Sequence, residues 1–257
     1  MLARQRQEHI LEAVRRHGAV RVSELVDSLG VSDMTVRRDL DALSGRGLVE
    51  KVHGGAVSVH RNTTDEPSFA AKSNRQLPEK TAIARAAAEL VEPGMAVGLS
   101  AGTTTWSLAT RLAEIGDLTV VTNSIRVAEV LHARSDPSQT VVLIGGIRTP
   151  SDALVGPLAV AAIRSLHLDA VFMGVHGIDG RSGLMTPNLM EAETNRALVE
   201  SARRLVVLCD HTKWGTVGIS SFARLDEVDV LITDPALDPD ARRQLEDQVG
   251  RLEVAVR

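Results

Sequence analysis

The stretch from Val31 to Leu40, VSDMTVRRDL, predicts a short helix with one apolar and one polar side. Ser32 can cap this helix by accepting a hydrogen bond from a backbone N–H of the first turn, and Asp33 adds a negative charge where the helix dipole favours one. Apolar residues at three- and four-residue spacing predict a single buried stripe along the helix: Val36, Leu40 and Leu43.

The polar side of the same helix carries residue types that contact nucleic acids. Met34, Arg38 and Asp41 fall opposite the apolar stripe, and Thr35 and Arg37 flank them. A short helix that exposes Thr and Arg near its N-terminus suits contact with DNA bases and phosphates. Taken alone, the pattern fits an ordinary amphipathic surface helix even better, so the neighbouring segments decide between the two interpretations.

Those neighbours predict a winged helix-turn-helix. Residues 4–17 carry apolar side chains on one helical face and end at Gly18, and residues 22–29 predict a second helix that turns at Gly30 into the third. After the third helix, the segments LVEKV and AVSV flank the run 53–55 (HGG) and predict a β-hairpin. Three helices followed by a hairpin, in this order, favour DNA binding over the surface-helix interpretation.

Composition places the chain among soluble globular proteins. With 257 residues, 44% hydrophobic and 24% charged, it has room for a small domain and a larger one. No run of about 18 apolar residues occurs and the N-terminus lacks the apolar core of a signal peptide, so we expect a cytoplasmic protein without a membrane partner. The single Cys209 and the scattered His residues predict no disulfide framework and no metal site, and we expect no cofactor.

The charge balance predicts that the DNA-binding unit works in pairs. The net charge is −4, and residues 1–60 hold nine Lys and Arg against eight Asp and Glu, a weak basic footprint for a DNA-binding domain. The cations that matter gather in the third helix and the hairpin: Arg37, Arg38, Arg46 and Lys51. We therefore expect modest affinity for each half-site and binding as a homodimer or homotetramer.

The rest of the chain predicts a linker and an α/β domain. Residues 60–78 are polar and punctuated by Pro67 and Pro78, which is typical of a linker and hinge, although Phe69 can dock on the following domain. From Glu79 onward, helices alternate with strands made of apolar runs, which predicts a mostly parallel sheet covered on both faces. The predicted organisation is a DNA-binding domain, a linker and an α/β domain: residues 1–59, 60–78 and 79–257.

Ligands of such sheets bind at the carboxyl ends of the strands, where this chain places small polar groups. Glycine allows close backbone approach there, hydroxyls donate hydrogen bonds, a helix N-terminus favours an anion, and a Lys can pair with phosphate. The candidate residues are Ser100, Gly102, Thr103, Thr104, Thr105, Asn123, Ser124, Gly145, Gly146, Asp210 and Lys213. Helix capping, tight turns and an Asp210–Lys213 surface pair are the simpler alternatives. Together, these groups fit a small anionic polyol such as a sugar phosphate.

Both halves of the chain resemble the DeoR family of bacterial transcriptional regulators. The matching residues in the first half are Arg6, Ile10, Val22, Leu25, Leu29, Gly30, the string Val31-Ser32-x-x-Thr35-Val36-Arg37-Arg38-Asp39-Leu40, and His53-Gly54-Gly55-Ala56. Those in the predicted α/β domain are Gly102-Thr103-Thr104, Val121-Thr122-Asn123-Ser124, Gly145-Gly146, Leu154-Val155-Gly156-Pro157, Glu191-Ala192-Glu193 and Asp210-His211-Thr212-Lys213-x-Gly215.

The resemblance implies a second domain related to ribose-5-phosphate isomerase and glucosamine-6-phosphate deaminase, which binds phosphorylated sugars or their relatives and oligomerises. It adds Glu191 to the candidate effector site. Two positions depart from the family's usual pattern, because many members carry an acidic residue where Ser100 stands and Lys where Asn195 stands. Both positions are expected near the ligand's hydroxyls or phosphate, so the identity of the effector stays open.

The sequence thus predicts a repressor of carbohydrate-metabolism genes that binds double-stranded operator DNA and responds to a small phosphorylated sugar. The DNA-contacting residues are expected to be Ser32, Thr35, Arg37, Arg38, Lys51 and His53. The alternative is a sugar-phosphate isomerase or deaminase, with a catalytic base among His176, Asp179, Glu191 and Glu193. We expect no catalytic residue, because capping or ligand-orienting roles are commoner for such groups and a fused winged helix gives an enzyme no evident advantage.

Overall fold

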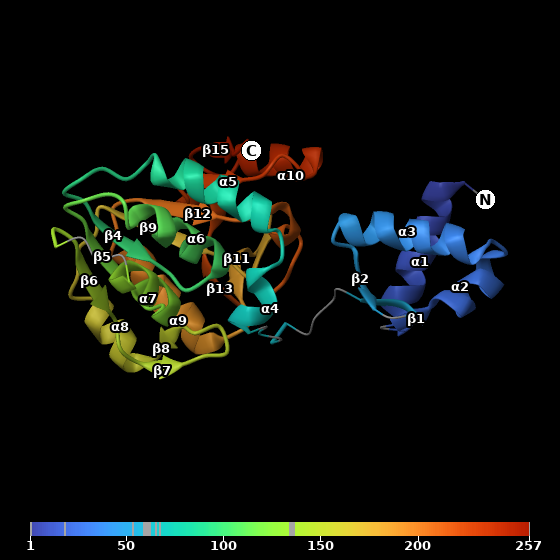
Figure 1. The fold of residues 1–257 in the computed structure, drawn as a ribbon, viewed down its shortest axis with the longest axis horizontal. Coiled ribbons are helices and arrows are strands. Elements are labelled where there is room, and N and C mark those ends of the chain that lie inside the picture. Colours follow the sequence, from blue (N-terminus) through green and yellow to red (C-terminus); the bar gives the residue numbers. More distant parts are fainter. Residues whose placement is uncertain are drawn as a thin grey trace. The chain divides into compact units, whose positions relative to one another are not determined.

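The computed structural model describes residues 2–17, 19–52, 54–58, 63–64, 66, 68–133 and 137–256. They form two compact units, and the boundary between the units falls between residues 62 and 63 (Figure 1). Each unit has its own hydrophobic core and is described separately. Within the described ranges, no helix is long and apolar enough to cross a membrane.

The first unit is a winged helix-turn-helix, which confirms the prediction. Its elements are α1 (Ala3–His17), β1 (Ala19–Arg21), α2 (Val22–Leu29), α3 (Asp33–Gly45), β2 (Val49–Val52) and β3 (Gly55–Ser58). The predicted hairpin gains a third strand from the segment before α2, which gives an antiparallel sheet of order β1-β3-β2. The predicted stripe of Val36, Leu40 and Leu43 is at most 1% exposed and packs with Ile10 and Val14 of α1.

The second unit is built on a seven-stranded sheet in which every neighbouring pair is parallel. Its strands are β4 (Ala96–Leu99), β5 (Thr119–Thr122), β6 (Thr140–Leu143), β9 (Ala170–Gly174), β12 (Leu205–Leu208), β14 (Val230–Thr233) and β15 (Leu252–Val254). Their order is β15-β14-β12-β9-β4-β5-β6, so the chain starts at β4, builds outward to β6, and then crosses back to β9. Such a reversal opens a crevice at the carboxyl ends of β4 and β9.

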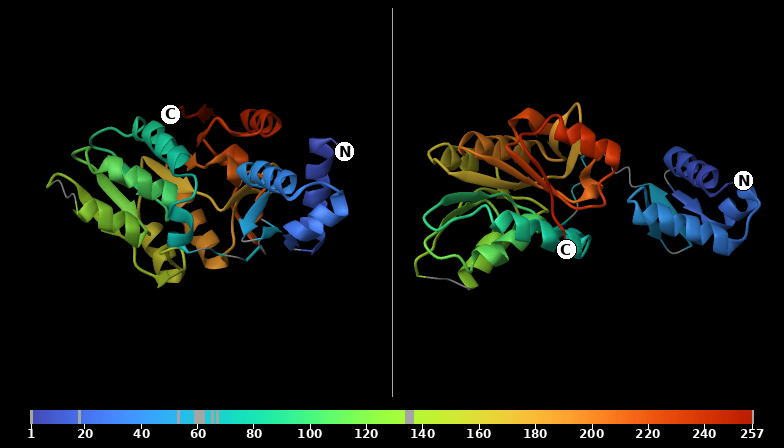
Figure 2. Two further views of the ribbon diagram at one scale, coloured as in Figure 1. Left: turned by 45° about the vertical axis from the view of Figure 1, so that its right-hand side comes forward. Right: turned by 90° about the horizontal axis from the view of Figure 1, so that it is seen from above.

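Helices cover both faces of this sheet, because its strands carry apolar side chains on both sides. One face is covered by α5 (Leu77–Ala88), α6 (Thr103–Leu112) and α7 (Ile125–Ala133), and the other by α8 (Pro157–Ile163), α9 (Leu189–Glu200) and α10 (Pro239–Glu246). The view from above in Figure 2 separates the first group, drawn in teal and green, from the rest of the unit. A short hairpin precedes α8: β7 (Ile147–Arg148) and β8 (Leu154–Val155).

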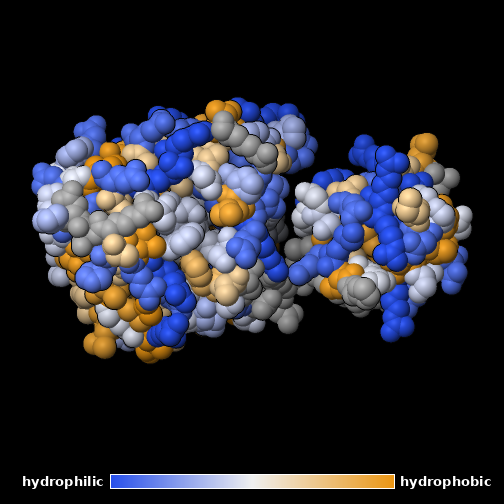
Figure 3. Space-filling model, in the orientation of Figure 1, coloured by the Kyte–Doolittle hydropathy of each residue, from blue (hydrophilic) through white to orange (hydrophobic). Residues whose placement is uncertain are grey.

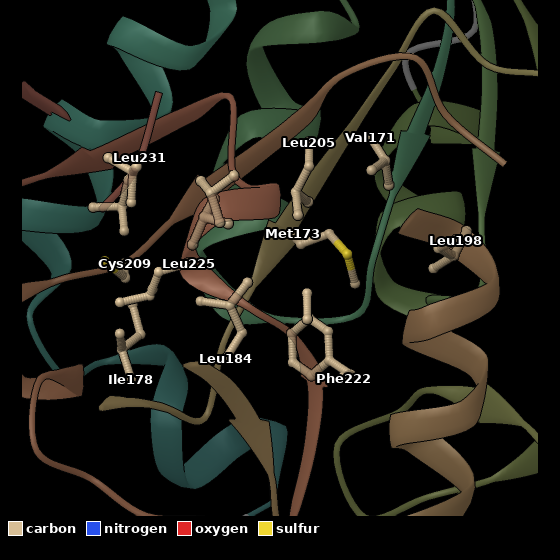
Figure 4. Close-up of a cluster of buried hydrophobic side chains, with 14 of the residues drawn as sticks. Val171, Met173, Ile178, Leu184, Leu198, Leu205, Cys209, Phe222, Leu225 and Leu231 are labelled. Atoms are coloured by element: carbon tan, nitrogen blue, oxygen red, sulfur yellow. The ribbon is translucent and has the colours of Figure 1, made fainter. Parts of the chain in front are cut away.

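The face that carries α9 also holds a small antiparallel sheet that the sequence did not predict. Its order is β10-β11-β13, and its strands are β10 (Gly177–Asp179), β11 (Gly183–Thr186) and β13 (Ser220–Ala223). Leu184 and Phe222 of this sheet pack against Val171 and Met173 of the large one (Figure 4). Cys209 is buried in the same cluster, and burial raises the pKa of its thiol.

The segment between the two predicted domains differs from a free linker. Residues 60–62, 65 and 67 lie outside the described residues, but the remainder belongs to the second unit and forms α4 (Phe69–Ser73) and the start of α5. Pro78 occupies the first turn of α5, where its missing N–H and fixed φ are favourable, so this proline starts a helix. Phe69 docks on the second unit as predicted, edge-on to Trp106 at 6.0 Å and beneath the Arg126 guanidinium at 5.6 Å.

Candidate functional site

The N-terminus of α3 is built by the cap that the sequence predicts. The Ser32 hydroxyl accepts a hydrogen bond from the Thr35 N–H at 3.3 Å and lies 2.9 Å from the Thr35 hydroxyl. Because the apolar stripe is buried, the opposite side of α3 faces solvent, and Met34 is 79% exposed there. This arrangement leaves the polar side of the helix accessible along its first two turns.

The cations of α3 and of the hairpin differ in their partners. The Arg37 guanidinium pairs with Asp33 at 2.5 Å, and Lys51 of β2 pairs with Asp41 of α3. The exposed Arg38 makes no hydrogen bond or ion pair with the residues that the structure describes. A guanidinium without an internal partner keeps all its donors for DNA, so Arg38 is the strongest candidate base reader. The predicted contact at His53 lies outside the described residues.

A buried ion pair fixes α3 against α1. Asp39 is 4% exposed and accepts hydrogen bonds from Arg6 at 2.6 and 3.2 Å and from Gln7 at 3.3 Å. The sequence pattern placed Arg6 and Asp39 among the family-like residues without assigning them a role. In the folded unit, these side chains orient the helix that carries the candidate DNA contacts.

The second candidate site lies at the reversal point of the parallel sheet. The loops after β4 and β9 meet there, and their residues line one pocket together with groups from other elements: Glu66, Lys72, Ala101, Gly102, Thr103, Thr104, Gly174, Val175, His176, Thr186, Pro187, Glu191, Asn195, Lys213 and Phe222. Gly102 is the N-cap of α6 and supplies no side-chain cap, so the first-turn N–H groups of α6 remain available for an anion.

Lys213 is held in this pocket by a single-turn helix, η1 (His211–Lys213). Asp210 caps the turn by accepting hydrogen bonds from the N–H and the hydroxyl of Thr212, and Asp234 accepts hydrogen bonds from the N–H and the ring of His211 at 2.7 and 2.9 Å. The Lys213 ammonium has no ion pair within the described part of the chain. Asp210 therefore shapes the loop, and the ammonium charge stays available to a ligand.

Only some of the predicted effector residues line the pocket: Gly102, Thr103, Thr104, Glu191 and Lys213. Ser100, Thr105, Asn123 and Ser124 sit behind it and bond to the backbone. The Ser100 hydroxyl accepts a hydrogen bond from the Gly174 N–H at 3.1 Å, and the Asn123 amide bridges the Ala101 N–H and the Leu154 carbonyl at 3.1 Å each. The Thr105 hydroxyl donates to the Gly102 carbonyl, and the Ser124 hydroxyl accepts from the Val127 N–H.

The glycines at 145 and 146 belong to the turn before β7 and are not among the pocket-lining residues of the described chain. At Gly146 a Cβ would lie 2.6 Å from the Val155 carbonyl oxygen, so β8 packs too closely for any side chain. Close packing therefore accounts for a glycine at this position. Direct ligand contact by these two glycines, and by the four polar residues behind the pocket, remains a prediction.

Several pocket residues were not predicted. Glu66 and Lys72 come from the segment interpreted as a linker, and Thr186 and Phe222 come from the small antiparallel sheet. The one signal for the first pair was the sequence Glu66-Pro67-Ser68-Phe69, where an aromatic residue interrupts a polar stretch. Asn195, the residue that departs from the family pattern, also lines the pocket, as expected.

Two carboxylates of the pocket lining, Glu66 and Glu191, differ in the direction of their pKa shifts. Burial raises the pKa of Glu191 from 4.5 to about 7, and the charge of Glu66 adds to this, while Lys72 and Thr186 act in the opposite direction. Burial alone would also raise the pKa of Glu66, but hydrogen bonds from Asn188, Ser151 and Thr149 outweigh it and hold that pKa below its usual value. The pocket thus combines one firmly ionised carboxylate with one that titrates near neutral pH.

The residues considered for catalysis do not all gather at this site. His176 and Glu191 line the pocket, whereas Asp179 accepts hydrogen bonds from the N–H groups of Arg181 and Ser182, which lower its pKa and make it a turn cap. Glu193 is exposed and lines a different surface hollow between α8 and α9.

The fold and the two sites define a class of protein, a winged-helix DNA-binding unit followed by an α/β unit with a charged pocket at the reversal of a parallel sheet. Residues 6–62 match the family model described as a DeoR-like helix-turn-helix domain, and residues 75–235 match the DeoR C terminal sensor domain. The chain belongs to the DeoR family of transcriptional regulators.

Several curated proteins are similar over nearly the whole chain. The HTH-type transcriptional regulator GlpR of Haloferax volcanii is 39% identical, covering 96% of this chain and 95% of that protein. The uncharacterized HTH-type transcriptional regulator YgbI of Escherichia coli K12 is 38% identical, with 99% of each covered. A solved D-ribose-5-phosphate isomerase in complex with phospho-erythronic acid aligns with 52% of each chain at 17% identity and a TM-score of 0.39.

Proposed function

We propose that this protein represses genes of carbohydrate metabolism and leaves its operator when a phosphorylated sugar or related polyol binds the pocket. The observation that carries the proposal is the pairing of an uncapped α6 N-terminus with the Lys213 ammonium at the sheet reversal. Together they offer N–H donors and a positive charge to a phosphate. Phe222 is the only Phe, Tyr or Trp among the described lining residues, which gives little aromatic surface for stacking a nucleobase.

Names of similar proteins support the same proposal. The lactose phosphotransferase system repressor of Streptococcus mutans is 35% identical over 91% of this chain and 93% of that protein. A putative aga operon transcriptional repressor of Escherichia coli O157:H7 is 32% identical over 92% of this chain. We extend repression and sugar-linked control from these proteins to this one.

Two further assignments belong to this proposal. Residues before 63 bind DNA, and the second unit binds the effector and joins copies of the chain into a dimer or tetramer. Figure 3 shows apolar side chains on the face of the second unit that carries α8 and β7, where Leu158 and Ile147 are 77% and 55% exposed. Paired subunits would double the weak positive charge of the DNA-binding unit. Light scattering of the purified protein measures the subunit number.

Replacing Arg38 with alanine is expected to weaken specific operator binding by about 1–3 kcal/mol, because a guanidinium without an internal partner can pair with a guanine edge. The operator is first selected from a random-sequence DNA pool, and the dissociation constant is then measured at fixed salt. Arg203→Ala, whose side chain is 86% exposed in the second unit, removes the same charge and serves as the control. Equal affinity of wild type and the Arg38 variant would remove Arg38 from the interface.

Replacing Lys213 with glutamine is expected to abolish the response to phosphorylated compounds, because the ammonium is the charge placed to pair with phosphate. The measurement is the change in melting temperature and in operator affinity across a panel of sugar phosphates, matched free sugars and inorganic phosphate. Lys213→Arg keeps the charge and is the matched variant. Full induction of the glutamine variant would exclude Lys213 from the site, and chemical conversion of any compound by the wild type would favour an enzyme.

A further inference from the structure

The pocket has a wall that comes from the chain immediately after the DNA-binding unit. We call residues 63–73 the strap; the described part of it is 63–64, 66 and 68–73. Glu66 and Lys72 of the strap line the pocket together with Lys213, Glu191 and the N-terminus of α6. The strap therefore contributes both a negative and a positive charge to the candidate effector site.

The Glu66 carboxylate is fixed by two separate elements. Its Oε2 accepts a hydrogen bond at 3.0 Å from the amide of Asn188, which is also the N-cap of α9, and its Oε1 accepts one at 3.2 Å from the N–H of Ser151. These bonds, with further hydrogen bonding from the side chains of Ser151 and Thr149, fix the orientation of the carboxylate at the pocket wall. The hydrogen bonds from Asn188 and Ser151 also keep the pKa of Glu66 below its usual value, so it is ionised at neutral pH.

Lys72 and the backbone of the strap are anchored in the same way. The Lys72 ammonium donates a hydrogen bond to the Ser151 hydroxyl at 2.9 Å. The Lys72 backbone carbonyl accepts a hydrogen bond from the ammonium of Lys80, a residue that is 3% exposed. The Phe69 N–H donates to the Pro150 carbonyl at 3.3 Å, and the Phe69 ring packs on Trp106. These hydrogen bonds and ring contacts hold the polar groups of the strap in place before a ligand binds.

The pocket lining offers two chemically different sets of polar groups. The α6 N-terminus and Lys213 suit a phosphate, whereas the carboxylates of Glu66 and Glu191 suit neighbouring hydroxyl groups, which donate hydrogen bonds to them. Glu191 lines the same pocket as Glu66 and Lys72, and the charge of Glu66 contributes to its raised pKa, so we group Glu191 with the strap residues. A ligand that pairs with both sets must carry an anion and several hydroxyls.

We propose that Glu66 and Lys72 bind the hydroxyl-bearing end of the effector, so that the ligand directly contacts the segment that follows the DNA-binding unit. This inference rests on the proposed function, because it assigns the second set of polar groups in the same pocket. It gives the ligand a way to act on DNA binding: a ligand shifts an equilibrium only through contacts that differ between two states, and in this proposal those contacts are made to the strap.

The test compares ligands that differ by one hydroxyl. Binding of inorganic phosphate, D-ribose 5-phosphate, 2-deoxy-D-ribose 5-phosphate, D-glucose 6-phosphate and 2-deoxy-D-glucose 6-phosphate to the full chain is measured by calorimetry. In Glu66→Gln, affinity for the best hydroxylated compound should fall about tenfold or more, while phosphate affinity changes less than about twofold. The preference of the wild type for that compound over its deoxy analogue should shrink, and Lys72→Gln should repeat the pattern.

Two controls separate this contact from a structural role. Lys213→Gln should weaken phosphate and sugar phosphates alike, and Glu193→Gln, an exposed substitution on α9, should change neither. Equal weakening of every compound by Glu66→Gln, or no effect of either strap variant, would overturn the inference and leave the proposed function standing. Failure of the wild type to bind any phosphorylated compound would contradict the proposed function, and the inference with it. If Glu66→Gln does not fold, Lys72→Gln carries the same comparison.

Discussion

Replacing Asp39 with alanine is expected to lower the free energy of unfolding of the DNA-binding unit by about 3 kcal/mol or more. The substitution removes the acceptor of Arg6 and Gln7 and takes one partner away from a largely buried ion pair, which is the costly way to break such a pair. Operator affinity should fall as well, because the same ion pair orients α3. The expected loss of unfolding free energy is several times larger than the loss expected when an exposed ion pair of the same helix is removed.

Unfolding of the DNA-binding unit can be measured separately from unfolding of the second unit. Both tryptophans, Trp106 and Trp214, lie in the second unit, so thermal unfolding followed by circular dichroism should change while the tryptophan transition stays in place. Asp41→Ala is the matched control, since its ion pair with Lys51 is exposed and should contribute less than about 1 kcal/mol. An apolar pair, Arg6→Met with Asp39→Leu, should recover much of the loss. Equal effects of the two alanine variants would contradict a special role for Asp39.

Replacing Glu191 with glutamine is expected to stabilise the second unit at pH 8 and to change it little at pH 5. The pKa of Glu191 lies at about 7 in the folded protein and at the ordinary 4.5 when unfolded, so the folded state holds this proton more tightly. Stability from this group is therefore complete below pH 4.5 and is lost as pH rises through 7. A shift of this size corresponds to at most about 3 kcal/mol, and glutamine removes the penalty of ionisation.

Thermal unfolding followed by tryptophan fluorescence from pH 5 to 8 measures this prediction. From pH 5 to 8, the melting temperature of the wild type should fall relative to that of Glu191→Gln. The difference between the two melting temperatures should grow as Glu191 ionises. Glu193→Gln, two residues away on the exposed side of α9, should follow the wild type at every pH. Parallel melting curves for wild type and Glu191→Gln would show that Glu191 is not held in a desolvated place beside Glu66.

The DNA-binding unit was predictable because its information is local. Apolar spacing fixed the buried stripe of α3, the Ser32 hydroxyl supplied the cap, and the run from 53 to 55 indicated the hairpin. The third strand, β1, was not predicted because it has only three residues and shows no alternation of apolar and polar side chains that could be recognised in the sequence. Its partner β3 makes it a strand, and that pairing joins residues far apart in sequence.

The candidate effector site was predictable only in part. Polar residues after strands pointed to the correct edge of the sheet, and Thr103, Thr104 and Lys213 do line the pocket. The sequence could not separate groups that line the pocket from groups that bond to the loops behind it. Asn123 and Thr104 both come just after a strand, so their positions in the chain do not distinguish them. Their difference arises from where neighbouring backbone groups lie, as the Asn123 bridge between the Ala101 N–H and the Leu154 carbonyl shows.

The sequence by itself determined the two compact units, the helix α3, the parallel sheet and the family. These depend on the period of apolar residues, on capping chemistry and on motifs a few residues long. Only the tertiary structure decided that Arg38 remains unpaired with the described residues while Arg37 meets Asp33, and that the apparent linker supplies Glu66 and Lys72 to the pocket. A polar segment is expected to be solvent-exposed from its sequence, yet hydrogen bonds from Asn188 and Ser151, residues more than eighty positions away, hold it against the folded unit.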